Sequence, residues 1–209
     1  MSTVQDVILV RHGESMANLS GRFAYQSWDP PLSSKGQIQA QHVASYLHSL
    51  PITWLASSPL LRARETMAPL AQRLAMEPLV LPELVELNMG LWDGLVLDEL
   101  KVSDATRFAA WSQDPENSPP PQGESILGVG RRVLAGLDRF FEGRPSGLMV
   151  ATTHADCLKG VMLVVLDAPG GSARRISSPN IALLHLKRTP NGRWLVSLGS
   201  LPQPPAADG

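Results

Sequence analysis

Several features that define other protein classes are scarce in this sequence. It contains a single cysteine, Cys157, so an intramolecular disulfide is excluded. No apolar run approaches the ~20 residues that a helix needs to span a bilayer. Residues 1–6 are polar and lack the apolar core of a signal peptide. We therefore expect a cytoplasmic protein with no membrane partner.

An excess of charge of one sign is also missing. The formal net charge is -1, which argues against a nucleic-acid partner because such surfaces are strongly basic. An anionic ligand would have to be held by a few local cations. Hydrophobic residues make up 44% of the 209 residues, enough for a sizeable core. We expect a single domain over residues 1–200 and a disordered tail at 201–209.

Short apolar runs alternate with helical patterns along the chain. The runs are typical of strands buried on both faces, and they lie at 7–10, 53–56, 79–81, 147–152, 181–186 and 193–198. Residues at helical spacing, almost all of them apolar, follow Ser33, Pro59 and Gly123. They are Ala40, Val43, Leu47 and Leu50; Ala63, Thr66, Leu70 and Leu74; and Ile126, Val129, Val133, Leu137 and Phe140. This order predicts an α/β fold, a three-layer α/β/α sandwich with a mostly parallel central sheet.

The ends of these elements give finer predictions. Ser33 or Ser34 is expected to cap the first long helix, and Pro59 suits the first position of the next. The proline-rich segment 114–122 predicts a loop, which is either a rim of the active site or a surface connector.

Arg11, His12 and Gly13 follow the first predicted strand directly. In open α/β sheets, ligand sites form beyond the carboxyl ends of the strands. A permanent cation, an imidazole and a glycine that permits close backbone approach could together hold and attack a phosphate. Taken alone, the triplet fits a structural histidine in a tight turn better.

Other residues strengthen the catalytic interpretation. His154 follows the predicted strand 147–152, so two strands would deliver imidazoles to one sheet edge. Arg62 lies in the first turn of a helix, where a cation is unfavourable unless an anion is bound. This mismatch favours Arg62 over Arg64 as a phosphate ligand. Glu86 stands between apolar neighbours, and partial desolvation would raise its pKa as a general acid needs, although a loop carboxylate is ordinarily just solvated.

The ordered set of motifs resembles the histidine phosphatase superfamily, in the branch of cofactor-dependent phosphoglycerate mutases and small-molecule phosphatases. The resemblance covers residues 7–186. It rests on Leu-Val-Arg-His-Gly-Glu-Ser at 9–15 with Asn18, Pro31-Leu32-Ser33 with Gly36 and Gln39-Ala40, Ser-Ser-Pro-Leu-Leu-Arg-Ala at 57–63 with Thr66, Glu86 with Gly90 and Trp92, Gly123-Glu124-Ser125, and His154.

The resemblance implies a role for each matching residue. His12 would be the nucleophile that forms a phosphohistidine, with its other ring nitrogen donating to a backbone carbonyl. Glu86 would be the general acid and base, and the phosphoryl oxygens would be bound by Arg11, Arg62 and the catalytic His154, assisted by Asn18. The implied activity is a phosphoric monoester hydrolase of the histidine acid phosphatase type that acts on small-molecule phosphate esters. We expect neither a metal ion nor another cofactor.

One departure concerns the second histidine, where the family often has Ser-His-Gly-Gly and this chain has Thr153-His154-Ala155-Asp156. Asp156 would either orient a neighbouring group or cap the following helix, and the cap is favoured. Cys157 is expected to be a small buried residue, since no thiol partner or metal-ligand spacing surrounds it.

Two alternatives to a phosphatase remain at this point, a phosphoglycerate mutase and a non-catalytic phosphate-binding regulator. A mutase needs cations for a second phosphate, but segment 87–122 holds only Lys101 and Arg107 against Asp93, Asp98, Glu99, Asp104, Asp114 and Glu116. A second candidate rim, 21–29, offers Arg22, Phe23, Tyr25 and Trp28, which suit an apolar leaving group or serve as packing residues. The sequence therefore favours hydrolysis, and it does not reveal the substrate or the oligomeric state.

Overall fold

A six-stranded sheet forms the centre of the molecule, which the computed structural model describes for residues 5–197. The strand order is β3-β2-β4-β1-β5-β6. Strands β1 to β4 pair in parallel, while β5 runs antiparallel to β1 and β6 antiparallel to β5. The strands are β1 (Gln5–Arg11), β2 (Ile52–Ser57), β3 (Leu79–Val80), β4 (Gly147–Thr153), β5 (Leu183–Arg188) and β6 (Trp194–Val196). The predicted mostly parallel α/β sheet is confirmed.

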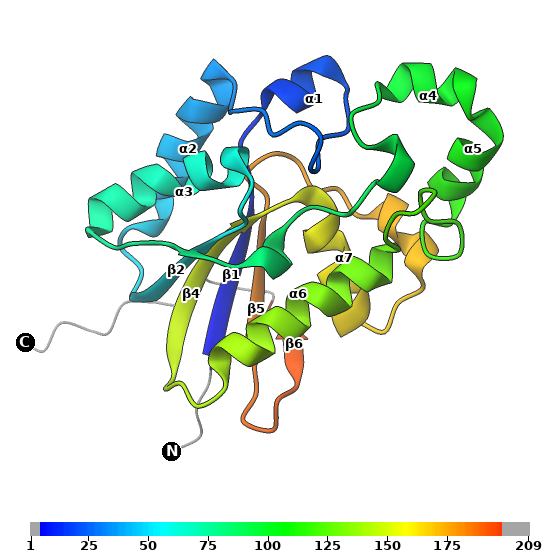
Figure 1. Cartoon of the computed structure of the whole chain (residues 1–209). Helices are drawn as coiled ribbons and strands as arrows, with labels where there is room; N and C mark the ends of the chain where they lie inside the picture. Colours follow the sequence, from blue (N-terminus) through cyan, green and yellow to red (C-terminus); the bar gives the residue numbers. More distant parts are fainter. Residues whose placement is uncertain (1–4, 198–209) are drawn as a thin grey trace, which may run out of the picture.

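Helices cover both faces of this sheet (Figure 1). The α-helices are α1 (Met16–Ser20), α2 (Ser34–Leu47), α3 (Leu61–Leu74), α4 (Leu97–Ser103), α5 (Ala105–Gln113), α6 (Ile126–Phe141) and α7 (Ala155–Val165). Short 3-10 turns are η1 (Pro82–Leu84), η2 (Gly90–Trp92) and η3 (Gly170–Arg175). Helices α2 and α3 pack on one face, and α6 and α7 on the other, which gives the predicted three layers.

The alternating side chains of β1 show why its sequence is apolar throughout. Ile8 and Val10 belong to the core cluster on the α2–α3 face, whereas Val7 and Leu9 belong to the cluster on the α6–α7 face. All four side chains are fully buried. A strand between two helical layers has no polar face, because alternate side chains point into opposite cores.

The first residues of α2 and α3 can be compared with the helix starts predicted from the sequence. Ser33, rather than Ser34, is the N-cap of α2, and its hydroxyl accepts the N–H of Gly36. Pro59 is not the first residue of α3, which begins at Leu61. The N–H of Ser58 donates to the carbonyl of Thr152, so the chain stays extended past the end of β2 and turns into the helix later than predicted.

The later strands are shifted from their predicted bounds. Strand β5 begins two residues after position 181, because Ile181 lies in a turn with a φ of 59°. Strand β6 covers the middle of the predicted strand 193–198, and position 198 lies outside the described residues. The predicted tail at 201–209 also lies outside them. Segment 114–122 contains no helix or strand, which confirms the predicted loop.

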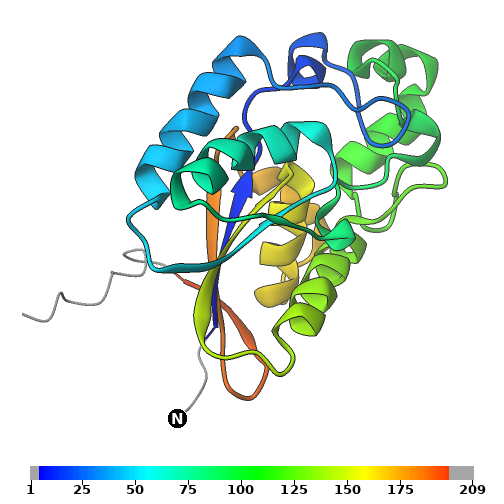
Figure 2. The same ribbon diagram turned by 60° about the vertical axis from the view of Figure 1, so that its left-hand side comes forward.

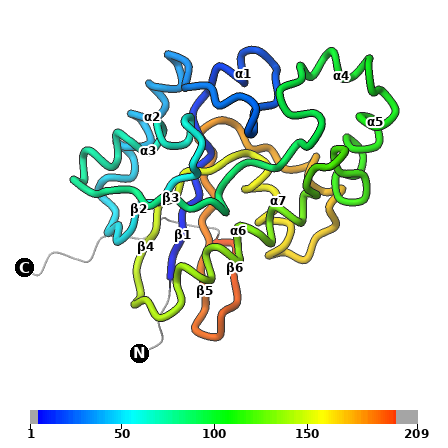
Figure 3. The backbone as a smooth tube through the Cα atoms, viewed as in Figure 1, coloured from blue at the N-terminus to red at the C-terminus, as the bar shows by residue number. Residues whose placement is uncertain are grey.

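Helices α1, α4 and α5 lie beyond the carboxyl ends of the parallel strands (Figures 1 and 2). The tube view shows the chain leaving β1 and β4 toward this side of the molecule (Figure 3). The sequence did not predict these short helices, and α5 contains no fully buried residue that would mark an apolar stripe. Among residues 5–197, no helix is long and apolar enough to cross a membrane.

Candidate active site

His12 stands at the carboxyl end of β1 with its ring buried. Its backbone N–H donates to the carbonyl of Thr153, which continues the β1–β4 ladder by one residue. Its Nδ1 lies 2.7 Å from the carbonyl oxygen of Gly13, so the ring proton sits there and Nε2 carries the lone pair. Burial, and then the charge of Arg62, lowers the pKa of His12 to about 3. The imidazole is therefore neutral at physiological pH, as a nucleophilic nitrogen requires.

Arg62 contacts Nε2 of His12 directly. It lies in the first turn of α3, as predicted, and its side chain is only 3% exposed. Its Nε lies 3.2 Å from Nε2 of His12, and its Nη2 donates to the carbonyl of Ala24. The carboxylate of Asp29 accepts the N–H of Leu61 and lies 3.7 Å from Nη1 of Arg62. Asp29 thus compensates a cation at a helix N-terminus, while Arg64 is exposed, as expected.

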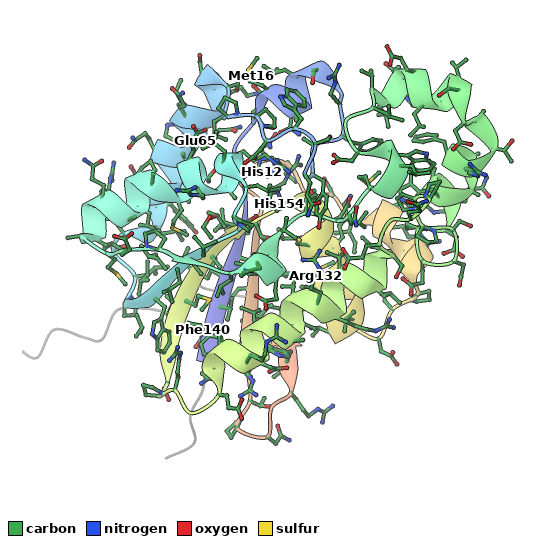
Figure 4. The ribbon with its side chains drawn as sticks, viewed as in Figure 1. His12, Met16, Glu65, Arg132, Phe140 and His154 are labelled. Carbon is green, nitrogen blue, oxygen red and sulfur yellow. The ribbon has the colours of Figure 1, made fainter. Side chains whose placement is uncertain are left out.

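His154 lies beside His12 at the end of the neighbouring strand β4 (Figure 4), with ring centroids 5.1 Å apart. It is fully buried, and its Nε2 lies 2.7 Å from the hydroxyl oxygen of Ser58. That oxygen also accepts the N–H of Leu60, and its hydroxyl group can donate its own proton to Nε2 of His154. This arrangement favours a proton on Nδ1, and burial lowers the pKa of the ring well below its usual value.

Three buried nitrogen atoms in this region have no hydrogen-bond partner within the described residues. They are Nε of Arg11, Nη1 of Arg62 and Nδ1 of His154. Arg11 is half-buried, and one of its terminal nitrogens donates to the carbonyl of Ser178. Buried polar atoms are almost always paired, and an unpaired donor carries a free-energy cost. Donors on three residues of one site are the arrangement that a bound anion would satisfy.

Glu86 approaches the same site from the chain segment after β3 and η1. Its side chain is half-buried, and its Oε1 accepts the N–H groups of Leu87, at 2.9 Å, and Asp156, at 3.3 Å. Burial, and then the negative charge of Asp156, raises the pKa of Glu86 to about 7. The expected desolvation of this carboxyl group is confirmed. Such a group exchanges its proton near neutral pH, which suits general acid–base chemistry.

Arg132 of α6 (Figure 4) holds the segment that carries Glu86. Its guanidinium donates to the carbonyl oxygens of Glu83, Val85 and Glu86. The same guanidinium is fixed by a bidentate pair with Glu124, at 2.9 and 2.7 Å. A planar, fork-shaped donor is well suited to bind several oxygens at once. The position of Glu86 therefore depends on one half-buried side-chain pair.

Asn18 is placed at the margin of the site. Its side chain is exposed, and its Oδ1 accepts the N–H of Ser15, which completes the capping box of α1. The same oxygen accepts from Nδ2 of Asn180, which also donates to the carbonyl of His12. Asn18 is thus linked to the backbone of the nucleophile, and its phosphate-binding role stays a prediction.

The four predicted rim residues are arranged in different ways. Arg22 is exposed, and its guanidinium lies over the ring of Trp28, 5.4 Å from the centroid. Phe23 packs against the core cluster, with its ring 6.0 Å from that of Trp111, so it is a packing residue. Tyr25 is half-buried, and its backbone N–H donates to Asp93.

The residues after His154 correct one expectation and confirm another. Asp156 does not cap α7 through its side chain, because His154 occupies the N-cap position and Asp156 lies in the first turn. Its carboxylate pairs with Lys159 instead, at 3.0 Å, while its N–H contacts Glu86. Cys157 is fully buried, as predicted, and burial raises the pKa of its thiol.

Several residues of the site were not predicted from the sequence. Ser58 and Glu124 lie inside motifs that were recognised, but their contacts were not apparent. Asp29, Arg132 and Asn180 carried no local signal, since each acts on a residue far along the chain. Among residues 5–197, no group of three or more His, Cys, Asp or Glu side chains could hold a metal ion.

Comparison with known proteins agrees with this geometry. The model of the histidine phosphatase superfamily (branch 1) matches residues 7–200. A bifunctional protein of Mycobacterium tuberculosis is 33% identical over 171 residues, which cover 81% of this chain and 46% of that protein. The chain therefore spans about half the length of that relative. A probable phosphoglycerate mutase of Escherichia fergusonii is 31% identical, over 91% of this chain and 88% of the relative.

A solved structure shows the same fold. The mycobacterial glucosyl-3-phosphoglycerate phosphatase superposes with a TM-score of 0.81 at 22% identity, covering 93% of this chain and 98% of that chain. The match of the family model extends over almost the whole chain and includes His12, Arg62, Glu86 and His154. The chain belongs to the histidine phosphatase superfamily, branch 1.

Proposed function

We propose that this protein hydrolyses small-molecule phosphate monoesters through a phosphohistidine on His12, without a metal ion. The observation that carries the proposal is the set of buried nitrogen donors around a neutral imidazole. In phosphoryl transfer, charge spreads over the three outer oxygens of a loose transition state. Donors on Arg11, Arg62 and His154 are fixed in advance to meet that charge, which is the most effective form of electrostatic catalysis.

The first chemical step transfers the phosphoryl group from the ester to Nε2 of His12. The P–O bond to the leaving group breaks as the N–P bond forms, and the leaving oxygen takes a proton from Glu86. The hydrogen bond from Nδ1 to Gly13 keeps the lone pair on Nε2, which accepts the Nε–H of Arg62 and would turn to the phosphorus of a bound ester. Glu86 can supply the proton because burial raises its pKa to about 7.

The second step releases phosphate. Glu86, now ionised, removes a proton from a water molecule as this water attacks the phosphorus of the phosphohistidine. The N–P bond breaks, and Nε2 of His12 recovers its lone pair. One residue therefore serves as acid and then base, and the covalent intermediate divides a difficult displacement into two easier ones.

A mutase is the second candidate, because one of the similar proteins is named a probable phosphoglycerate mutase. A mutase must hold two phosphates, which requires cations beyond those around His12. Lys101 and Arg107, the only cations in segment 87–122, form ion pairs with Asp98 and Asp104 and are exposed. Their neutralisation favours hydrolysis over transfer.

The decisive experiment supplies 3-phosphoglycerate with catalytic 2,3-bisphosphoglycerate and follows 2-phosphoglycerate and free phosphate together. A phosphatase releases phosphate faster than it forms 2-phosphoglycerate. Faster formation of 2-phosphoglycerate would establish the mutase. A protein that catalyses neither reaction and does not hydrolyse p-nitrophenyl phosphate would be a non-catalytic regulator.

Metal independence is tested separately. The arginines already neutralise the phosphate dianion, so activity toward p-nitrophenyl phosphate should survive EDTA. Vanadate should inhibit, because it adopts the five-coordinate geometry of the transition state. Loss of activity in EDTA that a divalent ion restores would refute this part of the proposal.

A further inference from the structure

A cavity of about 260 Å³ is lined by residues of the segment after Glu86, of α5 and α6, and of α7 and η3. Its walls include Leu87 and Asp156, the two residues whose N–H groups bind Oε1 of Glu86. The proton donor to the leaving group is therefore one hydrogen bond away from the cavity wall. In the proposed reaction the leaving oxygen must meet Glu86, so this cavity is a candidate site for the rest of the leaving group.

The walls of the cavity combine apolar surface with a cationic rim. Leu87 and Ile126 are almost completely buried and give an apolar lining, together with the ring of Trp111. Lys159 and Arg174 contribute cations from α7 and η3. Small-molecule sites commonly have this composition, mostly apolar walls with a few placed polar groups.

The charges around the cavity leave one cation unbalanced. Asp156 pairs with Lys159 at 3.0 Å and neutralises it. Arg174 is exposed and forms no ion pair with any residue that the structure describes. The local sum over these three residues is one positive charge, which favours a ligand with one negative group.

A second donor at the cavity has no acceptor. The indole Nε1 of Trp111 is buried and unpaired within residues 5–197, and it is the one such atom outside the His12 region. Trp111 packs its ring against Phe23, Trp92 and Phe108, so its orientation is fixed by aromatic contacts. A buried N–H of this kind is expected to have a partner, and a carboxylate oxygen is a suitable one.

We infer that the cavity bounded by Leu87, Trp111, Ile126, Asp156, Lys159 and Arg174 binds the leaving group of the substrate, and that this leaving group has an apolar body and a terminal carboxylate. The inference rests on the proposed phosphatase function and names its substrate class. The phosphate binds at His12, the ester oxygen meets Glu86, the apolar body lies against Leu87 and Ile126, and the carboxylate pairs with Arg174.

The test compares three phosphate esters that differ only at the far end of the leaving group. They are 4-(2-carboxyethyl)phenyl phosphate, the uncharged 4-propylphenyl phosphate and the cationic 4-(2-aminoethyl)phenyl phosphate. The phosphate and the aromatic body are the same, so differences in kcat/KM report recognition of the terminal group. The expected order is carboxylate, then propyl, then amine, with about tenfold between the first two, as a charge-assisted hydrogen bond provides.

Matched variants locate the effect. Arg174→Met should lower kcat/KM for the carboxylate ester about tenfold and leave the propyl ester within about twofold. Arg175→Met is the control, since Arg175 is the next residue of η3, is equally exposed and does not line the cavity. Trp111→Phe keeps an aromatic ring but removes the N–H, and it should reduce the carboxylate preference about fivefold.

Three outcomes would overturn the inference. These are equal kcat/KM for the three esters, equal losses in Arg174→Met and Arg175→Met, or a loss in Arg174→Met that is the same for all esters. Binding of the product acid, 3-(4-hydroxyphenyl)propanoate, is measured in parallel by tryptophan fluorescence. Binding that Arg174→Met weakens, in a protein that hydrolyses no ester, would support the cavity and refute the phosphatase. Hydrolysis of all three esters by a protein that does not bind the product acid would support the phosphatase and refute the cavity.

Discussion

The nucleophilic half of the site and the acid half are built by different means. His12 and His154 follow adjacent parallel strands, and Arg62 follows the next strand by five residues, so the sheet itself brings them together. Glu86 follows only a 3-10 turn, and Arg132 holds its segment through three backbone carbonyls. The first half is fixed by the fold, whereas the second depends on a single side-chain clamp.

Because of this difference, we expect different substitutions to affect each half of the site. A substitution remote from the chemistry cannot easily displace a residue at the end of a central strand, because the whole ladder would have to move. A substitution in the Arg132–Glu124 pair can displace Glu86 while the phosphate site remains intact. The two halves also respond to pH with opposite sign, since burial lowers the pKa of His12 and raises that of Glu86.

The largest expected effect comes from removing the nucleophile. His12→Gln should reduce kcat/KM at least about 10,000-fold, for aryl and alkyl phosphates alike, because no covalent intermediate forms. Steady-state rates with p-nitrophenyl phosphate and an alkyl phosphate measure this. His48→Gln, which changes an exposed histidine outside the site, is the control and should retain activity. A variant of His12 that keeps a tenth of the activity would contradict the assignment.

Removal of the acid should separate the two halves. Glu86→Gln should slow alkyl phosphates by about 100- to 10,000-fold in the phosphorylation step, because an alkoxide must be protonated as it leaves. A nitrophenolate leaves without protonation, so its burst phase should change little. In the wild type, phosphorylation by alkyl phosphates should decline above pH 7, where Glu86 loses its proton. Equal losses for both leaving groups in a burst experiment would remove Glu86 from the acid role.

Disruption of the Arg132–Glu124 pair should reduce activity in the same way as Glu86→Gln, but less strongly. Arg132→Met removes the donors to the carbonyls of Glu83, Val85 and Glu86, and we expect about a tenfold loss for alkyl phosphates and a smaller one for aryl phosphates. Glu124→Gln keeps the shape of the pair and should lose less. Partial rescue by Arg132→Lys would be consistent with a positioning role. Identical losses for both substrate types would indicate general destabilisation instead.

A further expected effect is on stability, and it has opposite signs for the two halves. The pKa of His12 falls from 6.5 to about 3 on folding, so the unfolded chain binds more protons between these values and stability falls as pH drops through this window. The pKa of Glu86 rises from 4.5 to about 7, so the folded chain binds more protons there and stability falls as pH rises through it.

Denaturation in urea at pH 5 and pH 8, without phosphate, measures these contributions. Relative to the wild type, His12→Gln should gain about 2 kcal/mol more at pH 5 than at pH 8. Glu86→Gln should gain about 2 kcal/mol more at pH 8 than at pH 5. Shifts of the same sign in both variants would contradict the opposed pKa changes.

The same contrast explains how much of the molecule the sequence predicted. The strand–histidine pattern is local, so His12, His154 and the parallel sheet could be inferred before the structure was known. Arg132 lies 46 residues from Glu86, and nothing in the periodicity of its helix distinguishes it from a solvated arginine. The short helices α4 and α5 were missed because their packing depends on tertiary contacts.

The cations that line the cavity near Glu86 could not be identified from the sequence, because they lie far from Glu86 along the chain. The two rims predicted from the sequence were segments 21–29 and 87–122. Lys159 and Arg174 come from α7 and η3. Only the folded chain brings them to the same cavity as Trp111 and Leu87. Local patterns indicate the chemistry of a site, whereas the residues proposed here to bind the leaving group come from segments far apart in the sequence.

The most direct test of the account is to trap the intermediate. The enzyme is mixed with p-nitrophenyl phosphate, quenched in alkali because phosphohistidine is acid-labile, digested, and mapped by mass spectrometry. Phosphate should be found on the peptide that contains His12, with no adduct in His12→Gln. An adduct on a serine, or on His154 in place of His12, would contradict it.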